Sequence, residues 1–428
     1  MVKFDVFPEI LPHVKYIWSI FLRHVETSDP LNEIDLTIGQ GERSDIKISG
    51  DFHKCIEGRK YDHQSLFRDA PLFLTESGKP DYLGTAFYLI NSLQEHDSEL
   101  KDKFGRFPYE ASLQSRFECS TENLVIGYFR ALFKQTSQLK SGLKWKDLPS
   151  GIFVSHDIDL IRGALYEDGV WAIKKGRFDI LLSLIWMEFI SDPYWLNIDQ
   201  IMNINDEHDV KSTFFWLVRN GKARINGQEI SNANYHFKSP SIQNTIQKVS
   251  HRGFFNGLHK SISTDSIQDE ISQFQDAPEI NRNHYLLMQL PNHYHQIEES
   301  GIKLDCTLGF APNHGFRNSY GLPFQPFNMF EKRPYRFVEV PLHLMDATFR
   351  GYHFLEAEQA ERIMIEFIES HQTNCLISVL WHNNFFSNYK YAPWLNVYKR
   401  VLSTCREMGL KSWTPRNIIE NYLTNGGS

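Results

Sequence analysis

The sequence Gly151-Ile-Phe-Val-Ser-His-Asp-Ile-Asp159 decides the fold that we expect for this chain. Ile152 to Ser155 reads as a short buried strand, because strands covered on both faces show a continuous apolar run. Asp157 and Asp159 follow directly, and residues i and i+2 of an extended segment project to the same side. Parallel-sheet enzymes place their chemistry at this end of a strand. Two such carboxylates repel unless a cation or an arginine lies between them, so the motif indicates either a site or a solvated turn that caps the next helix.

Strand-like runs alternate with helical patterns throughout the chain that follows Gly151. The strand candidates are Ile152–Ser155, Val210–Val218, Phe254–Leu258, His284–Leu290, Lys303–Thr307, Phe337–Leu342, Leu376–Trp381 and Leu410–Trp413. The helix candidates between them are Ile201–Glu207, Ser241–His251, Asp265–Phe274, Asn292–Ser300, Glu356–His371 and Trp394–Met408. This alternation predicts an α/β fold, a distorted (β/α)7-8 barrel formed by residues 146–428.

Residues 1–145 form a second region, which we expect to be a smaller α/β domain. Short strand-like runs occur at Ile34–Ile38 and Ile46–Ile48, and helical patterns occur at Thr85–Gln94 and Leu124–Leu139. The sequence of this region contains no metal-ligand cluster and no phosphate-binding loop. Lys140–Ser150 is the expected junction with the barrel.

The composition limits the partners and the compartment of the protein. The 428 residues are long for one domain and sufficient for two. With a net charge of −7, the chain has no basic field to hold a nucleic acid or an anionic membrane. Its five cysteines lie far apart, as in proteins of a reducing compartment. Residues 1–25 lack a signal-peptide pattern, and the apolar run Ile180–Ile190 is shorter than the roughly 20 residues of a membrane span. We therefore expect a cytoplasmic protein without a membrane span.

Polar side chains recur where the expected strands end. His259 follows one strand, Arg282 precedes another, and Asp305, Asp346 and His382 come at or after three more. A single histidine in such a position is more often structural. Side chains repeated at the same end of successive parallel strands converge on one rim, so the set indicates a site.

The order of these motifs resembles that of a known family. The matching segments are Val154-Ser-His-Asp-Ile-Asp159, Lys211-Ser-Thr-Phe-Phe215, Gly257-Leu-His259, Arg282-Asn-His-Tyr285, Gly301–Gly309, Gly315-Phe-Arg317, Val340-Pro-Leu342 with Asp346, and Trp381-His-Asn383. In this order they resemble the polysaccharide deacetylase family, carbohydrate esterase family four, in the branch with a His-Asp-x-Asp first motif. The resemblance covers about residues 151–415. Residues 1–145, especially Gly105-Arg-Phe-Pro108, resemble the uncharacterised N-terminal region that often precedes such domains.

The resemblance implies a distorted barrel that holds a divalent metal and removes N- or O-acetyl groups from sugars. Asp159 and His259 would ligate the metal, because carboxylate oxygen and imidazole nitrogen suit zinc, with cobalt and nickel as alternatives. The metal would polarise the acetyl carbonyl and acidify a bound water.

The resemblance also implies an acid and a base. Asp157 would take the proton of the water as general base, and Arg282 would hold that carboxylate in place. His382 would protonate the departing amine or alkoxide as general acid. A carboxylate would orient His382, with Asp346 favoured over Asp305.

The second motif departs from the family pattern, which has two metal-binding histidines four residues apart. The segment here is His259-Lys-Ser-Ile-Ser263, so Ser263 occupies the second position. Catalytic zinc usually has three protein ligands, which leaves the third to be found. The first candidate is His314, and His156, His293 and His295 are the others; the last two lie on a helical pattern that we expect to be solvated.

The aromatic residues near the rim are candidates for sugar binding. Tyr285, Phe385 and Phe386 could stack on a pyranose ring, although core packing is the more common role of such residues.

Three functions agree with the sequence. The first is a metal-dependent deacetylase acting on an acetylated amino sugar in surface-polysaccharide assembly, with a nucleotide- or lipid-linked intermediate as substrate. The alternative is a catalytically silent glycan-binding or scaffold protein on the same barrel, which the missing histidine motivates. The third is an amidohydrolase acting on a non-sugar amide, because barrels host many chemistries.

Overall fold

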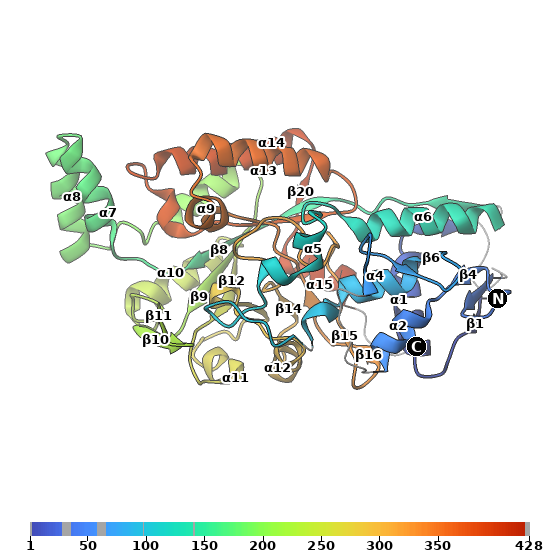
Figure 1. The fold of residues 1–428 in the computed structure, drawn as a ribbon. Coiled ribbons are helices and arrows are strands. Elements are labelled where there is room, and N and C mark those ends of the chain that lie inside the picture. The colour runs from blue at the N-terminus through green and yellow to red at the C-terminus, as the bar shows by residue number, and fades with distance from the viewer. Residues whose placement is uncertain (1, 28–35, 58–65, 97, 140–141, 424–428) are drawn as a thin grey trace.

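A curled sheet of nine strands is the centre of the structure (Figure 1). The computed structural model describes residues 2–27, 36–57, 66–96, 98–139 and 142–423. The strands lie in the order β17-β14-β13-β12-β9-β8-β19-β18, and β20 pairs with the start of β8. The bounds are β8 (Gly151–Ile158), β9 (Thr213–Leu217), β12 (Phe255–Lys260), β13 (Ile280–Asn283), β14 (Leu304–Asp305), β17 (Val338–Glu339), β18 (Leu344–Met345), β19 (Leu376–Leu380) and β20 (Lys411–Ser412).

Every pair of neighbouring strands in this sheet is parallel. The two ends of the order, β17 and β18, do not pair with each other, so the sheet is an open, curled half-barrel. All eight residues of β8 are buried, which explains why this strand shows a continuous apolar run. The parallel barrel-like sheet predicted from the sequence is confirmed, although it does not close.

Helices connect the strands and cover the sheet. They are α7 (Ala164–Lys174), α8 (Phe178–Phe189), α9 (Ile198–Glu207), α10 (Pro240–His251), α11 (Ile267–Ile271), α12 (Asn292–Ser300), α13 (Ala357–Ser370), α14 (Ala392–Glu407) and α15 (Pro415–Tyr422). An antiparallel hairpin of β10 (Lys222–Ile225) and β11 (Gln228–Ser231) follows β9, and short turns of helix lie at η4 (His284–Leu286), η5 (Thr348–Tyr352) and η6 (Asn383–Phe386). In the part of the chain that the structure describes, no helix is both long enough and apolar enough to cross a membrane.

One predicted strand, His284–Leu290, is wrong. The strand is β13, just before it, and His284–Leu286 is a helical turn in which Tyr285 has a φ of +59°. Strand β13 is polar because its side chains bind other polar groups of the barrel: Asn281 donates to Asp305 at 2.8 Å. The apolar run that suggested a strand is buried as a loop instead.

The N-terminal region has its own small sheet and helices. A three-stranded parallel sheet is formed by β1 (Val2–Asp5), β3 (Leu36–Gly39) and β4 (Ile46–Lys47). The other elements are α1 (Leu11–Leu22), α2 (Gly50–Ile56), α4 (Tyr82–Ile90), η2 (Leu93–Glu95), η3 (Tyr109–Ala111), α5 (Leu113–Arg116), α6 (Leu124–Leu139), β2 (Val25–Thr27) with β7 (Leu143–Trp145), and β5 (Phe73–Leu74) with β6 (Pro80–Asp81). The predicted strand Ile34–Ile38 begins outside the described residues, at positions 34 and 35.

The N-terminal region packs against the barrel through a continuous apolar core. Helix α1 contacts β16 (Arg333–Pro334), which pairs with β15 (Phe327–Asn328). A buried ion pair joins Glu95 to Arg317, with 2.6 Å between Oε2 and Nη2. The backbone N–H of Val125 donates to the carbonyl of Ser319 at 3.1 Å. A domain boundary near residue 145 stays a prediction.

Candidate active site

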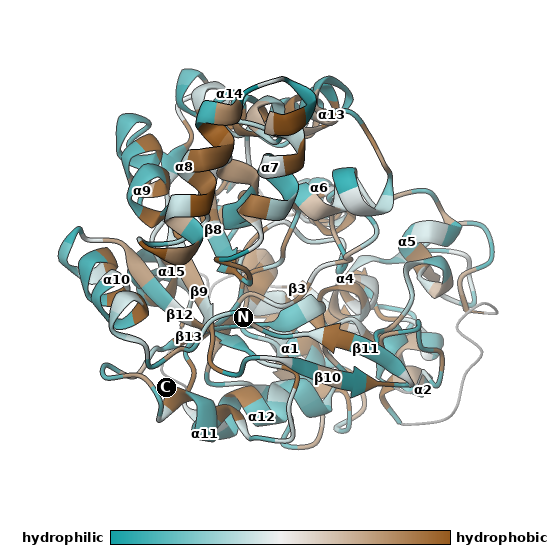
Figure 2. Ribbon diagram, turned by 90° about the vertical axis from the view of Figure 1, so that its left-hand side faces the viewer, coloured by the Kyte–Doolittle hydropathy of each residue, from teal (hydrophilic) through white to brown (hydrophobic). Residues whose placement is uncertain are grey.

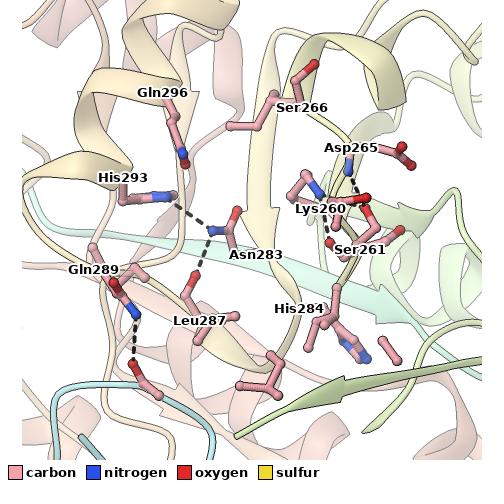
Figure 3. Close-up of a pocket in the computed structure, with 18 of the residues that line it drawn as sticks. Lys260, Ser261, Asp265, Ser266, Asn283, His284, Leu287, Gln289, His293 and Gln296 are labelled. Atoms are coloured by element: carbon pink, nitrogen blue, oxygen red, sulfur yellow. Dashed lines mark hydrogen bonds between the residues drawn. The ribbon is translucent and has the colours of Figure 1, made fainter.

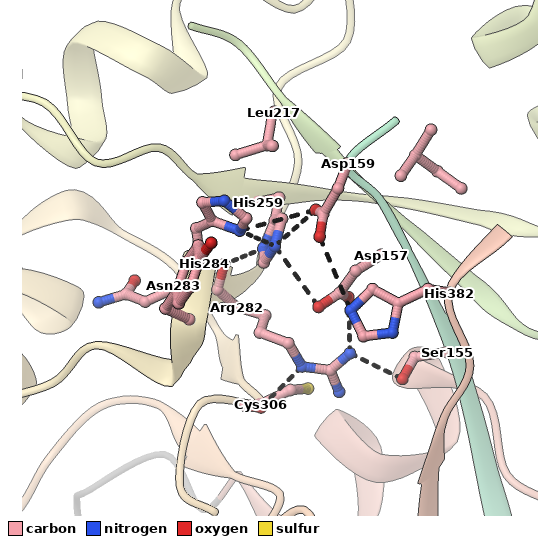
Figure 4. Close-up of polar contacts among 12 residues, drawn as sticks. Ser155, Asp157, Asp159, Leu217, His259, Arg282, Asn283, His284, Cys306 and His382 are labelled. Carbon is pink, nitrogen blue, oxygen red and sulfur yellow. Dashed lines mark hydrogen bonds and ion pairs between the residues drawn. The ribbon is translucent and has the colours of Figure 1, made fainter. Parts of the chain in front are cut away.

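Polar side chains from β13, β12, β8 and β19 meet at the carboxyl end of the sheet, where β9 lies between β12 and β8 (Figure 4). The strand register brings them together: His259 of β12 lies opposite Arg282 of β13, and Asp157 of β8 lies opposite Phe215 of β9. His382 follows β19, the neighbour of β8 on its other side. The convergence that the sequence predicted is therefore present.

Three side chains within this group form a potential metal site: Asp159, His259 and His284. The Nε2 of His259 lies 3.3 Å from Oδ1 of Asp159, and the Nδ1 of His284 lies 3.6 Å from the same oxygen. The two ring nitrogens are 3.1 Å apart. Ligand atoms of a tetrahedral zinc ion, each about 2.0–2.1 Å from the metal, lie roughly 3.3 Å from one another. The three donors are already spaced for such an ion.

The hydrogen bonds of the two rings point lone pairs into this space. The Nδ1 of His259 donates to the carbonyl of Arg282 at 2.8 Å, and the Nε2 of His284 donates to the carbonyl of Ser231 at 2.9 Å. With neutral rings, each other nitrogen carries a lone pair. The buried Oδ1 of Asp159 has no hydrogen-bond partner. A backbone carbonyl that accepts from the far ring nitrogen fixes the tautomer of a metal-binding histidine, so these residues fit a divalent metal.

His284 was not among the ligands expected from the sequence. Its only signal was its place in Arg282-Asn-His-Tyr285, one residue beyond the end of β13. Ser263, at the position where a histidine is missing, donates to Glu270 at 3.0 Å instead. The third donor thus comes from the next strand of the sheet.

The structure does not bring His314 into this cluster. Its ring packs 5.2 Å from that of Phe349 and 6.2 Å from that of Phe367. Burial lowers the pKa of His314 to about 4. Its environment is apolar and aromatic, as for a structural histidine.

The other three histidine candidates have partners elsewhere. His156 donates to the carbonyl of Trp381 at 2.9 Å, and its second nitrogen lies 3.1 Å from the amide nitrogen of Asn205. His293 is buried and contacts Asp305 at 2.6 Å, so the expectation that it is solvated is wrong. His295 is partly buried against Tyr335.

Asp157 lies next to the metal cluster and is held by Arg282. The Nη1 of Arg282 lies 2.9 Å from Oδ1 of Asp157 and donates to Oγ of Ser155 at 2.8 Å. Its Nε donates to the carbonyl of Cys306 at 3.0 Å. The second oxygen of Asp157 lies 3.4 Å from Nε2 of His259. The guanidinium therefore fixes one carboxylate oxygen and leaves the other facing the cluster.

His382 also lies next to the cluster, close to Asp157 (Figure 4). Its Nδ1 lies 2.7 Å from Oδ1 of Asp346, and its Nε2 lies 3.7 Å from Oδ2 of Asp159. Burial alone would lower the pKa of His382, but the carboxylate of Asp346, with smaller contributions from Asp159 and Asp157, raises it to about 10. Asp305, the other candidate partner, instead contacts His293. His382 is thus a proton-bearing group at neutral pH.

Charges in the cluster also shift the other groups. Burial would raise the pKa of Asp159, yet the facing His284, His259 and His382 hold it below its usual value. Burial would lower the pKa of His259, and the carboxylates of Asp157 and Asp159 raise it. Burial lowers the pKa of His284. Asp159 is ionised at neutral pH, as a metal ligand must be.

A cavity of about 1100 Å³ lies beside His284 (Figure 3). Eleven of its 25 lining residues carry amides or hydroxyls, which donate to and accept from sugar hydroxyls. Among them are Asn226, Ser263, Gln268, Asn283, Gln289 and Gln296. Phe104 of the N-terminal region also lines it, with its ring 5.2 Å from that of Tyr285.

The aromatic candidates differ in their positions. Tyr285 is half-buried next to the cavity, and its carbonyl accepts from Arg106 at 2.9 Å. Phe385 and Phe386 are buried, with their rings 5.7 Å from Trp394 and 4.8 Å from Tyr398 respectively. The structure thus places these two in the core under α14.

Comparisons with known proteins give distant structural likenesses. No family model matches the sequence, and no curated protein matches it. Among solved structures, the chain is similar to a protein assigned to the polysaccharide deacetylases from Mycobacterium smegmatis, with 12% identity, a TM-score of 0.39, and coverage of 64% of this chain and 91% of that one. It is also similar to the chitin deacetylase of Colletotrichum lindemuthianum, with 12% identity, a TM-score of 0.32, and coverage of 65% and 97%. A CE4 family pseudoenzyme from Bacillus anthracis gives 11% identity, a TM-score of 0.28, and coverage of 65% and 69%.

Proposed function

We propose that this protein is a metal-dependent deacetylase that removes an acetyl group from an acetylated amino sugar. The observation that carries the proposal is the convergence of the Asp159, His259 and His284 donors at 3.1–3.6 Å. Next to these donors lie Asp157, a carboxylate held by Arg282, and His382, an imidazole held by Asp346. Hydrolysis of an unreactive amide needs these components: a metal site, a base and an acid.

The reaction adds water across the amide C–N bond and releases acetate and a free amine. A divalent metal held by Asp159, His259 and His284, most simply zinc, would polarise the acetyl carbonyl and acidify the attacking water. The free oxygen of Asp157 accepts the proton of that water. His382 donates its Nε2 proton to the nitrogen that leaves, and Asp346 stabilises the charged ring before this transfer.

The neighbouring cavity supports a carbohydrate as substrate. Its amides and hydroxyls suit a neutral, hydroxyl-rich chain, and its volume of about 1100 Å³ exceeds typical pockets for single small molecules. We infer that residues of a sugar chain beyond the reacting unit lie along it. As the natural substrate we propose an intermediate of surface-polysaccharide assembly, linked to a nucleotide or a lipid, that the enzyme meets in the cytoplasm.

The alternative of a silent glycan-binding protein was motivated by Ser263. Because His284 supplies a third donor, the missing histidine no longer argues against a metal site. Zinc bound without hydrolysis of any acetylated sugar would favour the binding protein over the enzyme.

The test combines metal analysis with acetate release. The purified protein is expected to contain close to one zinc, cobalt or nickel ion and to release acetate from oligomers of N-acetylated amino sugars, but not from N-methylacetamide. Asp157→Asn should retain the metal and lose activity, because Asp157 is held by Arg282 and is not one of the three donors. A folded protein without metal after supplementation, and without acetate release, would overturn the proposal.

A further inference from the structure

The α7–α8 hairpin projects from the body of the molecule beside the carboxyl end of β8 (Figure 1). The segment after His382 fixes its base. Asp168 of α7 accepts from Oγ of Ser387 at 2.6 Å and from the backbone N–H of Lys390 at 3.0 Å. The rings of Trp171 and Tyr389 lie 5.8 Å apart. The hairpin is therefore attached to the rim of the candidate active site.

The outer face of this hairpin is apolar and exposed. Of the 15 large hydrophobic side chains that are exposed among the described residues, nine lie between positions 166 and 190. We call these nine residues the hairpin patch: Tyr166, Val170, Ile173, Phe178, Leu182, Ile185, Trp186, Phe189 and Ile190. Leu182 is 67% exposed and Phe189 is 75% exposed. A monomer in water rarely exposes such a continuous apolar surface without a partner.

The spacing explains why the patch is continuous. The residues on α7 recur at intervals of four and three, and most of those on α8 do the same, so each helix presents one apolar stripe. The opposite side of α8 is also apolar, with Ile180 and Leu184 buried. Figure 2 shows α8 coloured as hydrophobic along most of its length. A surface helix with water on its outer side would carry polar residues there.

The charges of the hairpin leave a positive tip. Each acidic side chain of the two helices has a partner: Glu167 pairs with Lys390, Asp179 with Arg177 and Glu188 with Arg162, while Asp168 accepts the bonds described above. Lys174 and Lys175, adjacent at the turn, are exposed and have no ion-pair partner among the described residues. The residual charge at the tip is therefore positive, while the one carboxylate near the patch without an ion-pair partner among the described residues, Asp192, follows Ile190 at the base of the hairpin.

We propose that the hairpin patch binds the surface of an anionic lipid bilayer. Helices of 11 and 12 residues are about 17–18 Å long, too short to cross a hydrocarbon core of about 30 Å. They are suited to lie in the interface with the apolar side chains among the headgroups and upper acyl chains. Tyr166 and Trp186 are of the aromatic class that favours this layer, Phe178 suits the apolar side, and the two adjacent lysines complement anionic headgroups.

The charge distribution favours lipid over a second copy of this chain. The net charge of −7 means that the protein as a whole is not attracted to an anionic surface, as the composition indicated. The electrostatic attraction is therefore confined to the two lysines of the hairpin tip, and apolar burial supplies the rest. A second copy would bring its own Lys174 and Lys175 near a similar patch, and every carboxylate on the two helices already has a partner. Binding of the hairpin to a bilayer would hold the active-site rim next to the membrane surface.

Vesicle flotation tests this proposal without reference to catalysis. The full-length protein is incubated with vesicles of phosphatidylcholine alone or of phosphatidylcholine and phosphatidylglycerol at 3:1. The wild type is expected to float with the mixed vesicles, and Trp186→Ser/Phe189→Ser to lose at least tenfold in partitioning. Lys174→Gln/Lys175→Gln should weaken binding to the mixed vesicles by roughly fivefold per lysine and leave binding to neutral vesicles unchanged.

A matched control removes equally exposed phenylalanines elsewhere. Phe330 and Phe354, 89% and 82% exposed, lie outside the hairpin, so Phe330→Ser/Phe354→Ser should float like the wild type. The wild type remaining with the unbound fraction on both vesicle types would overturn the proposal. A dimer in solution that only Trp186→Ser/Phe189→Ser dissociates, without vesicle binding, would also overturn it and assign the patch to a second copy. Asp157→Asn should float like the wild type even if it has lost deacetylase activity. The membrane proposal can therefore fail while the deacetylase proposal holds, and the reverse.

Discussion

The Nδ1 of His382 lies 2.7 Å from Oδ1 of Asp346, and the backbone N–H of His382 donates to Oδ2 of the same carboxylate, also at 2.7 Å. One buried carboxylate thus fixes both the ring and the main chain of the histidine. The Nε2 on the far side of the ring faces the candidate metal site. This arrangement both raises the pKa of His382 and sets the direction in which its Nε2–H points.

We expect Asp346→Asn to lower kcat by about 10²–10³-fold, within the range of general acid catalysis. The neutral amide that replaces the Asp346 carboxylate cannot stabilise the charged imidazole, so a smaller fraction of His382 is protonated at neutral pH. KM and metal content should stay close to the wild type, because Asp346 contacts none of the three donors. Steady-state kinetics on an N-acetylated oligomer, with metal analysis of the same sample, checks this. A matching loss of metal would show that Asp346 acts through the metal site instead.

His284→Ala tests the third ligand. Removing one of three protein donors should weaken zinc binding by at least 10–100-fold, the effect already seen for loss of supporting groups, and abolish acetate release. Ser263→Ala and His314→Ala are matched controls, because their side chains contact Glu270 and aromatic rings respectively. Competition with a chelator of known zinc affinity measures the Kd for zinc of each variant. Equal metal loss in His314→Ala and none in His284→Ala would reject the assignment.

The buried pair Glu95–Arg317 tests how firmly the N-terminal region is joined to the barrel. Glu95→Gln should lower the free energy of unfolding by about 3–5 kcal/mol, because Arg317 keeps its charge without a buried counter-ion. As the control, Asp199→Asn removes an exposed partner of Lys248 and should cost less than about 1 kcal/mol. Urea unfolding followed by fluorescence measures both. Two separate transitions, only one of which responds to Glu95→Gln, would support independent domains.

Local patterns in the sequence predicted most of the barrel. Helix α12 and helix α6 begin and end where the periodicity placed them, and β8 and β19 lie within a few residues of their predicted bounds. These elements bury a continuous run or one face, and that burial is encoded locally. Strand β13 was not predicted, because its polar side chains bind groups on other strands and no local sequence pattern reveals such contacts.

The site was predictable to the extent that strand ends converge. Asp157, Asp159, His259, Arg282 and His382 meet because successive parallel strands end at one edge. His284 could not be chosen over His314 from the sequence, because its role depends on the turn after β13 and on the carbonyl of Ser231 in a separate hairpin. The exposure of Phe189 and its neighbours likewise became visible only once α8 was placed outside the core.

His343 gives the protein a predictable acid sensitivity. Burial, with a smaller contribution from His371, lowers the pKa of His343 from 6.5 to about 3. The folded state therefore keeps it neutral while the unfolded chain binds a proton below about pH 6.5. His343 therefore leaves the free energy of unfolding unchanged well above pH 6.5 and lowers it as the pH falls, by about 2 kcal/mol at pH 5. His343→Asn, whose Oδ1 can accept the backbone N–H of Ser378 in place of Nδ1, should unfold with that much less pH dependence between pH 7.5 and 5. Parallel urea curves at the two pH values check this, and an unchanged difference would contradict it.

Phe104 tests whether the cavity beside His284 holds the substrate chain. Its ring comes from the N-terminal region and lines the cavity next to Tyr285. Loss of an aromatic contact of about 1 kcal/mol in Phe104→Ala should raise KM roughly fivefold for a tetramer of an N-acetylated amino sugar. KM for a dimer, which has fewer sugar units to place in the cavity, should rise less, and kcat should be unaffected. Phe354→Ala, which removes an exposed ring elsewhere, should leave both substrates unchanged. An equal rise in KM for dimer and tetramer would mean that Phe104 acts on the catalytic residues, and that the substrate chain lies outside this cavity.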